Sequence, residues 1–374
     1  MSETKQRKEW VVDRRHPRHG QLFLRESTNP ILTPEDWPYT VNAVFNPGAT
    51  IGPDGDTILL VRVEDRSGVS HLTVARSSDG LTGWQIEDRP LIAPIRGRYE
   101  DRWGAEDPRI TRLGEEYFIS YTGFSPSGPL VILARTQDFR SYELCSVVAP
   151  PEDKDAGLFG RRFGGRHALL HRPVSSGAHG EAPNIWLSFS PDLVHWGDHR
   201  IVIEPRRTSS WDREKVGLGP PPLETASGWL VLFHGVKATA AGSLYRAGLA
   251  LLDLEEPSIV LGRSNEWVFG PEAPYELQGD VPGVVFPTGW VAQQDGRVRV
   301  YYGAADTTVA VAFAWIDELV DFAYSHCVCG TFHPGRRCPL GGADPARATE
   351  ERPDALGLRP IGGQGIAPGG QDPG

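Results

Sequence analysis

The sequence predicts an all-β fold, a five-bladed β-propeller with its active site in the central channel. An apolar, β-rich run recurs five times, and no helical pattern of about 10–15 residues separates the copies. With 43 Gly, 32 Pro and 11 Trp among 374 residues, the chain has the turn formers and large aromatics of a fold built from short strands. The competing architecture, a two-sheet sandwich, is too small for about 300 residues of repeats.

The five runs each follow a turn signal and are rich in residues that favour strands. They are Asp56–Glu64, Glu116–Phe124, Arg166–Arg172, Gly228–Val236 and Arg297–Asp306. Equivalent positions in successive runs lie 60, 50, 62 and 69 residues apart, and each interval suits a four-stranded sheet with its turns. We therefore expect the five runs to occupy the same position in five radial sheets.

A second strand-and-turn signal follows four of the runs. Segments beginning at Ala75, Ala134 and Ser188 end a strand, pass through an Asp-containing turn and reach an aromatic residue, and Ala250–Pro257 is the equivalent in the fourth copy. We expect the Asp to cap its own turn and the aromatic ring to pack between sheets. After the fifth run, Val309–Tyr324 is expected to begin as a strand and end as a short helix.

Composition divides the chain into three segments. Residues 1–28 are charged and are assigned to an N-terminal extension, and residues 29–325 to the propeller. Residues 326–374 are rich in Gly, Pro and charge, which predicts a disordered tail. The tail contains Cys327, Cys329, His333 and Cys338, whose types suit zinc but whose spacing misses the usual paired cysteines, so no metal site is predicted.

The charge balance bears on partners and location. The chain has 38 Lys+Arg and 48 Asp+Glu, a formal charge of -10, which argues against nucleic acid as a partner. No stretch approaches the ~20 apolar residues that a membrane-spanning helix needs. The charged N-terminus lacks the apolar core of a secretory signal, so we expect no membrane association and a cytoplasmic location.

Polar residues stand at or near the ends of the five runs, where a central channel would gather them into one pocket. They are Arg62, Glu64, Thr122, Arg172, His234 and Asp306. The alternative is that each is a solvated residue at a sheet edge. Coincidence at equivalent positions of five repeats favours the shared pocket.

The densest candidate for chemistry is the segment Gly104–Ile110, which contains two adjacent carboxylates before a proline. Pro108 disfavours helix at Asp107 and keeps it extended. Side chains alternate along an extended strand, so Glu106 and Asp107 are expected to point to opposite faces, one as the working acid and the other bracing the backbone or meeting Arg109. The alternative is an acidic turn with a local ion pair.

A second candidate is a set of cations, Lys154, Arg172 and Lys215, with His234 and Tyr245 in the fourth repeat. If they converge they form an anion site, and phosphate suits it because guanidinium and ammonium groups donate charge-assisted hydrogen bonds to its oxygens. The alternative is three separate surface charges. Lys215 lies in a Gly- and Pro-rich loop, which favours a fixed position.

Asn46 is a third candidate, because it precedes Pro47 just before the first run. Its amide could face a sugar hydroxyl. The alternative is an ordinary Asn-Pro turn.

Ten motifs in this order carry a family resemblance: FNPGA, LLVRVED, GAEDPRI, KDAGLF, HRP, WDREKVGLGPPPLET, FHGV, LYRAGLALLD, YELQGDVPGVVFPTG and YYGAAD. The chain resembles glycoside hydrolase family 130, the β-mannoside phosphorylases and some related mannosidases, from about Asn29 to Phe322. The resemblance implies the same five-bladed propeller and makes Asp107 the general acid. It implies that the mannosyl unit is bound by Asn46, Arg62 and Asp306, with His234 and Glu276 also assigned to substrate binding. It implies a phosphate site made of Lys154, Arg172, Lys215 and Tyr245.

The expected reaction is inverting phosphorolysis of β-1,4- or β-1,2-mannosides, releasing α-mannose 1-phosphate, which makes the protein a glycosyltransferase-type phosphorylase. A phosphorylase needs an acid and a cationic site but no carboxylate to activate water, because phosphate is already an anionic nucleophile. No metal or cofactor is expected, with inorganic phosphate as co-substrate, and a homo-oligomer is possible.

Two alternatives are a hydrolase of the same family, which would lack the cations, and a non-catalytic glycan-binding propeller. One departure from the family pattern is Gly160-Arg161-Arg162, whose arginines could compete with Lys154 for the phosphate position.

Overall fold

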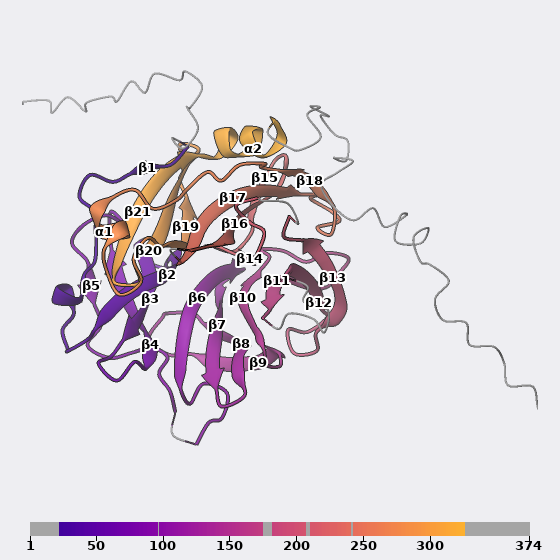
Figure 1. Cartoon of the computed structure of the whole chain (residues 1–374). Helices are drawn as coiled ribbons and strands as arrows, with labels where there is room; N and C mark the ends of the chain where they lie inside the picture. The colour runs from indigo at the N-terminus through magenta and orange to yellow at the C-terminus, as the bar shows by residue number, and fades with distance from the viewer. Residues whose placement is uncertain (1–21, 96, 175–181, 207–209, 241, 326–374) are drawn as a thin grey trace, which may run out of the picture. The chain divides into compact units, whose positions relative to one another are not determined.

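The computed structural model describes residues 22–95, 97–174, 182–206, 210–240 and 242–325, which form five antiparallel sheets arranged as the blades of a propeller (Figure 1). The first blade contains β2 (Ala43–Ile51), β3 (Thr57–Glu64), β4 (Ser70–Ser77) and β5 (Gln85–Ile86). The second contains β6 (Gly104–Leu113), β7 (Glu116–Ser125), β8 (Gly128–Thr136) and β9 (Glu143–Ala149). The third contains β10 (Asp153–Leu158), β11 (His167–Pro173), β12 (Ile185–Ser190) and β13 (Gly197–Ile203).

The fourth blade contains β14 (Lys215–Leu218), β15 (Leu223–Thr225), β16 (Gly228–Thr239), β17 (Gly242–Leu252) and β18 (Val260–Arg263). The fifth contains β19 (Val285–Ala292), β20 (Arg297–Ala304), β21 (Thr308–Trp315) and β1 (Leu24–Arg25). The short helical segments are η1 (Pro34–Asp36), α1 (Pro274–Leu277) and α2 (Ile316–Ser325). The predicted fold class is confirmed.

The five predicted runs are the second strands of the five blades, β3, β7, β11, β16 and β20. These strands are buried along most of their length because each lies between two neighbours of its own sheet and is covered on both faces by adjacent blades. Continuous burial explains why the runs are almost entirely apolar rather than alternating. The predicted change from strand to helix is also confirmed, since α2 begins directly after β21.

The turns after the third strands have the predicted Asp caps. In the first blade, Oδ1 of Asp79 accepts hydrogen bonds from the backbone N–H groups of Leu81 and Thr82, both at 2.8 Å. Asp138 and Asp192 make equivalent bonds in the second and third blades. These caps satisfy turn N–H groups that would otherwise depend on solvent.

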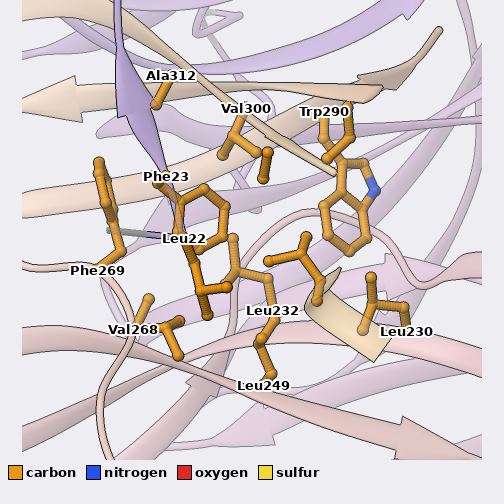
Figure 2. Packing of buried hydrophobic residues seen from close by; sticks show 14 of the residues in the cluster. Leu22, Phe23, Leu230, Leu232, Leu249, Val268, Phe269, Trp290, Val300 and Ala312 are labelled. Carbon is orange, nitrogen blue, oxygen red and sulfur yellow. The ribbon is translucent and has the colours of Figure 1, made fainter. Parts of the chain in front are cut away.

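The N-terminal segment closes the propeller. β1 pairs antiparallel with β21, through Leu24 opposite Phe313 and Arg25 opposite Ala312, so the last blade takes its outer strand from the start of the described chain. Leu22 and Phe23 are buried in the cluster between the fourth and fifth blades, which Figure 2 shows. The segment 22–28, predicted to belong to the extension, is therefore partly built into the fifth blade.

No helix in the described part of the chain is long and apolar enough to cross a bilayer. The predicted tail, with Cys327, Cys329, His333 and Cys338, lies outside the described residues. Most of the predicted extension also lies outside them.

Candidate active site

The innermost strands of three blades have a register shift at the same position. It lies between Phe45 and Gly48 in β2, between Glu106 and Arg109 in β6, and between Lys154 and Gly157 in β10. Such a β-bulge re-aims a side chain out of the regular alternation.

At each bulge an Asn or Asp adopts a left-handed backbone: Asn46 at φ 46°, Asp107 at φ 49° and Asp155 at φ 54°. Asn and Asp tolerate this conformation better than other non-glycine residues, which accounts for their use here. The repeated bulge therefore positions one polar side chain from each of three blades.

Asp107 is the centre of the first cluster. Its Oδ1 accepts a hydrogen bond from Nδ2 of Asn46 at 2.9 Å and from a terminal nitrogen of Arg62 at 3.0 Å. Burial alone would raise the pKa of the Asp107 carboxyl, but the charges of Arg62, Lys154 and Arg109 outweigh it and lower that pKa. The first blade thus holds the ionised form of a buried acid on the second blade.

The expectation that Glu106 and Asp107 point to opposite faces is wrong. Arg62 bonds both carboxylates, with Oε1 of Glu106 at 3.2 Å and Oδ1 of Asp107 at 3.0 Å. Strand alternation assumes extended backbone, and the bulge with a left-handed Asp107 removes that condition. Arg109 instead bonds the backbone carbonyl of Asp107, at 2.9 Å.

Asp306 is a second carboxyl near Asp107, and its pKa is shifted in the opposite direction. It follows β20 in a left-handed turn at φ 48° and accepts no hydrogen bond from any other described residue. Burial and the nearby charge of Asp107 raise its pKa to about 6, with Arg62 opposing them. Two carboxyls whose pKa values are pushed apart are typical of sites that handle protons.

Asp155 is the centre of the second cluster. Its carboxylate accepts a hydrogen bond from Nε of Arg172 at 2.7 Å, lies 3.6 Å from Nε2 of His234 and 3.5 Å from a terminal nitrogen of Arg109. Burial would raise the pKa of Asp155, but the charges of Arg172 and Arg109 hold it well below its usual range.

Asp155 was not among the site residues predicted from the sequence. The available signal was an acidic residue directly after Lys154 and before the apolar segment Ala156–Phe159. Nothing local distinguishes such a residue from a surface Asp, because its partners lie in other strands and other blades.

His234 is buried within this cluster. Burial lowers the pKa of its imidazole to about 3; Asp155 opposes that shift, and the charges of Arg172 and Lys215 reinforce it. The ring is therefore neutral at pH 7, and its Nδ1 has no hydrogen-bond partner among the described residues. A buried nitrogen without a partner is costly in a folded protein, so this atom is a candidate contact for a ligand.

The two predicted lysines border the same cluster. Lys154 stands directly opposite Arg172 in the β10–β11 ladder, and Nζ of Lys215 lies 5.2 Å from the ring centre of Tyr245. Neither lysine side chain makes a hydrogen bond or an ion pair within 4 Å with another described residue. Cations without an acidic partner near a buried cluster can bind an anion through charge-assisted hydrogen bonds.

Glu276 is not in contact with either cluster. Its carboxylate accepts hydrogen bonds from Nε of Arg25 and from the Tyr302 hydroxyl, each at 2.7 Å, and from the backbone N–H groups of Glu272 and Ala273. These donors occupy both of its oxygens. The structure therefore uses Glu276 to attach the closing strand β1 to α1.

Arg161 and Arg162 lie away from the clusters as well. Arg161 pairs with Glu255 at 2.9 Å, and Arg162 donates to the backbone carbonyl of Gly165 at 3.0 Å. Lys154 therefore has no competitor from that segment. No group of His, Cys, Asp and Glu within the described ranges could hold a metal ion.

Comparison with known proteins shows the family of the chain. The model of glycoside hydrolase family 130, described as β-1,4-mannooligosaccharide phosphorylase, matches residues 14–325. The chain belongs to glycoside hydrolase family 130.

Curated and solved members of the family are close in sequence and structure. A β-1,4-mannooligosaccharide phosphorylase of Ruminococcus albus is 34% identical over 312 residues, covering 82% of this chain and 92% of the relative. A 1,2-β-oligomannan phosphorylase of a Thermoanaerobacter species is 35% identical over 308 residues, covering 79% and 98%. The structure of a β-1,2-mannobiose phosphorylase from Listeria innocua, in complex with β-1,2-mannobiose, superposes with a TM-score of 0.74 at 29% identity, covering 80% of this chain and 99% of that one.

Proposed function

We propose that this family member is an inverting β-mannoside phosphorylase that transfers a mannosyl unit to inorganic phosphate. The observation that carries the proposal is that the buried acid Asp107 and a group of cations lie on neighbouring inner strands. These cations, Arg172, Lys154 and Lys215 around Asp155, are called the cationic cluster. An acid alone would suit either a hydrolase or a phosphorylase. The cations without acidic partners, Lys154 and Lys215, favour phosphate as the second substrate.

Roles follow from the contacts. Arg62, Asn46 and Asp306 surround Asp107 and are proposed to bind the mannosyl unit. Nε of Arg172 donates a hydrogen bond to Asp155. The terminal nitrogens of Arg172 make no hydrogen bond with a described residue, so they can donate to phosphate. The proposed phosphate site is completed by residues that border the same cluster, Lys154, Lys215 and Tyr245. His234 is proposed to contact the substrate through its Nδ1, which has no partner among the described residues.

The reaction breaks the bond between the anomeric carbon and the leaving oxygen and forms a bond from that carbon to a phosphate oxygen. Asp107 supplies the proton to the leaving oxygen, directly or through a sugar hydroxyl, and ends as a carboxylate. The products are α-mannose 1-phosphate and the shortened acceptor.

Asp107 must gain a proton before it can act, although its surroundings favour the ionised form. A phosphate anion beside Lys154 and Arg172 raises the pKa of Asp107, because it offsets their charge and adds a negative charge close by. We therefore infer that phosphate prepares the acid as well as attacking the sugar. Activity should then show a basic limb that moves to higher pH as the phosphate concentration rises.

The direct test is to incubate the protein with β-1,4- and β-1,2-mannobiose, with and without phosphate. We expect mannose 1-phosphate only when phosphate is present. Equal release of free mannose in both conditions would establish the hydrolase instead, and binding without any cleavage would establish the glycan-binding alternative.

The variant Asp107→Asn tests the acid. We expect at least a thousandfold loss of turnover because the amide cannot protonate the leaving oxygen, with an unchanged circular dichroism spectrum. Turnover within tenfold of wild type would remove Asp107 from the role of general acid.

A further inference from the structure

Arg109 connects three blades through one buried guanidinium. From the second blade it donates to two backbone carbonyls of the fourth blade. One belongs to Leu218, the last residue of β14, at 2.8 Å, and the other to the next residue, Gly219, at 2.6 Å. It also donates to the backbone carbonyl of Asp107 at 2.9 Å and contacts Asp155 of the third blade at 3.5 Å. Its side chain is only 1% exposed, so no solvent can replace these partners.

Asp155 is the point at which Arg109 contacts the cationic cluster. The same carboxylate binds Nε of Arg172 at 2.7 Å, so Arg109 and Arg172 share one acceptor group. One buried carboxylate between two arginines fixes the direction in which the free end of Arg172 points.

The fourth blade packs closely against this carboxylate. A methyl group added to Gly217 of β14 would lie 2.5 Å from Oδ2 of Asp155 and would collide with the His234 ring. Real side chains do not approach so closely, so only glycine lets β14 run past the cluster. The backbone of β14 therefore blocks any movement of the Asp155 carboxylate toward the fourth blade.

We propose that Asp155 and Arg109 are positioning residues, a buried link that sets Arg172 for phosphate and ties the cationic cluster to the backbone of Asp107. This inference rests on the proposed phosphorolysis and adds two residues to it. Neither residue needs to touch a substrate. Their contribution is to keep the phosphate-binding group and the acid at a constant separation.

A purely electrostatic role and a positioning role of Asp155 predict opposite changes in the KM for phosphate when the residue is replaced. Replacing Asp155 by Asn removes a negative charge from the cationic cluster, which by Coulomb attraction alone would strengthen phosphate binding and lower its KM. The positioning role predicts a higher KM, because a neutral amide holds the Arg172 guanidinium less firmly. We expect Asp155→Asn to raise the KM for phosphate at least tenfold.

The chain supplies a matched control in Asp212. This carboxylate is also fully buried between two arginines, Arg206 at 2.8 Å and Arg263 at 2.7 Å, but it contacts neither cluster. Asp212→Asn should lower the thermal midpoint, as Asp155→Asn does, and should leave the KM for phosphate within twofold of wild type. An equal rise in both variants would mean that the effect of Asp155→Asn is general destabilisation, and it would overturn the proposal.

Arg109→Lys provides a second variant that keeps the charge but cannot reach four acceptors at once. We expect Arg109→Lys to have a higher KM for phosphate and a lower kcat. In the double variant with Asp155→Asn, the fold-change in KM should be smaller than the product of the two single fold-changes, because both substitutions break the same network. A KM for phosphate within twofold of wild type or lower in Asp155→Asn, or independent effects in the double variant, would overturn the link. If Asp155→Asn does not fold, Arg109→Lys alone decides by the same KM criterion.

Failure of the proposed function has a different signature. The wild type would then cleave no mannoside in a phosphate-dependent way. In that case calorimetric titration with inorganic phosphate still tests the link, since Asp155→Asn must bind it at least tenfold more weakly than wild type and Asp212→Asn must not.

Discussion

At the scale of single residues, the site depends on two carboxyls in opposed environments. Asp107 is held ionised by Arg62 and Asn46, whereas Asp306 is buried beside that charge and has its pKa raised to about 6. Each state is a consequence of the neighbouring groups, because burial favours the neutral form of both. Keeping Asp306 ionised at neutral pH therefore costs folding free energy.

That cost is measurable with Asp306→Asn. Below pH 3.8, the ordinary pKa of Asp, the Asp306 carboxyl is protonated in both the folded and the unfolded chain. Between pH 3.8 and about 6 it is protonated only in the folded chain. The wild type therefore loses stability as the pH rises through this window. The loss amounts to about 3 kcal/mol above pH 6. We expect the variant to be more stable than wild type by up to that amount at pH 7 and equal to it near pH 3.5, in urea unfolding, while its mannoside KM rises. A stability difference that does not change with pH would contradict the raised pKa.

At the scale of elements, the inner strands combine regular pairing with one irregular position. β2 bulges at Asn46, and a neighbouring strand, β20 of the fifth blade, makes room for it through Gly303. A methyl group at Gly303 would collide with Oδ1 of Asn46 and lie 2.8 Å from its backbone nitrogen. The Asn46–Asp107 hydrogen bond thus requires a glycine in a different blade.

Gly303→Ala should therefore displace Asn46 from Asp107. We expect a loss of about 1–3 kcal/mol in stability from overpacking and at least a tenfold loss of phosphorolysis at a temperature where the variant is folded. Gly197→Ala in β13 is the control, because an added methyl there meets no atom within 4 Å. Wild-type rates in a folded Gly303→Ala variant would show that the position of Asn46 is not required.

At the scale of the whole molecule, ring closure brings residues of all five blades to one site. The closing strand β1 is only two residues long, and Arg25 within it bonds the buried Glu276 at 2.7 Å and 3.0 Å. Phe269, from the segment between the fourth and fifth blades, also packs under the Arg25 guanidinium. These contacts fasten the two ends of the ring.

Arg25→Met should destabilise the whole propeller by about 3 kcal/mol, because it leaves the Glu276 carboxylate buried without its counter-charge. Arg25→Met combined with Glu276→Gln should recover part of this loss, since no lone charge remains. Urea unfolding monitored by tryptophan fluorescence measures both. In the folded range the KM for mannoside should be that of wild type in both variants. A KM raised only in the double variant would favour the substrate-binding role of Glu276 that the sequence predicted.

The sequence alone determined the blade count, the second strand of every blade and the Asp-capped turns after the third strands. Those features are local: strand-forming runs, turn residues and their spacing are repeated along the chain and need no knowledge of which blade faces which. The ordered motifs, such as GAEDPRI and YYGAAD, are contiguous in the chain and are sufficient by themselves to indicate the family.

Only the tertiary structure decided which polar groups meet. It placed Glu106 and Asp107 on the same guanidinium, made Asp155 the acceptor shared by Arg109 and Arg172, and assigned Glu276 to ring closure. The physical reason is that a buried charge is stabilised by whatever opposite charge the fold brings within about 4 Å of it, and those partners are 17 to 251 residues away along the chain.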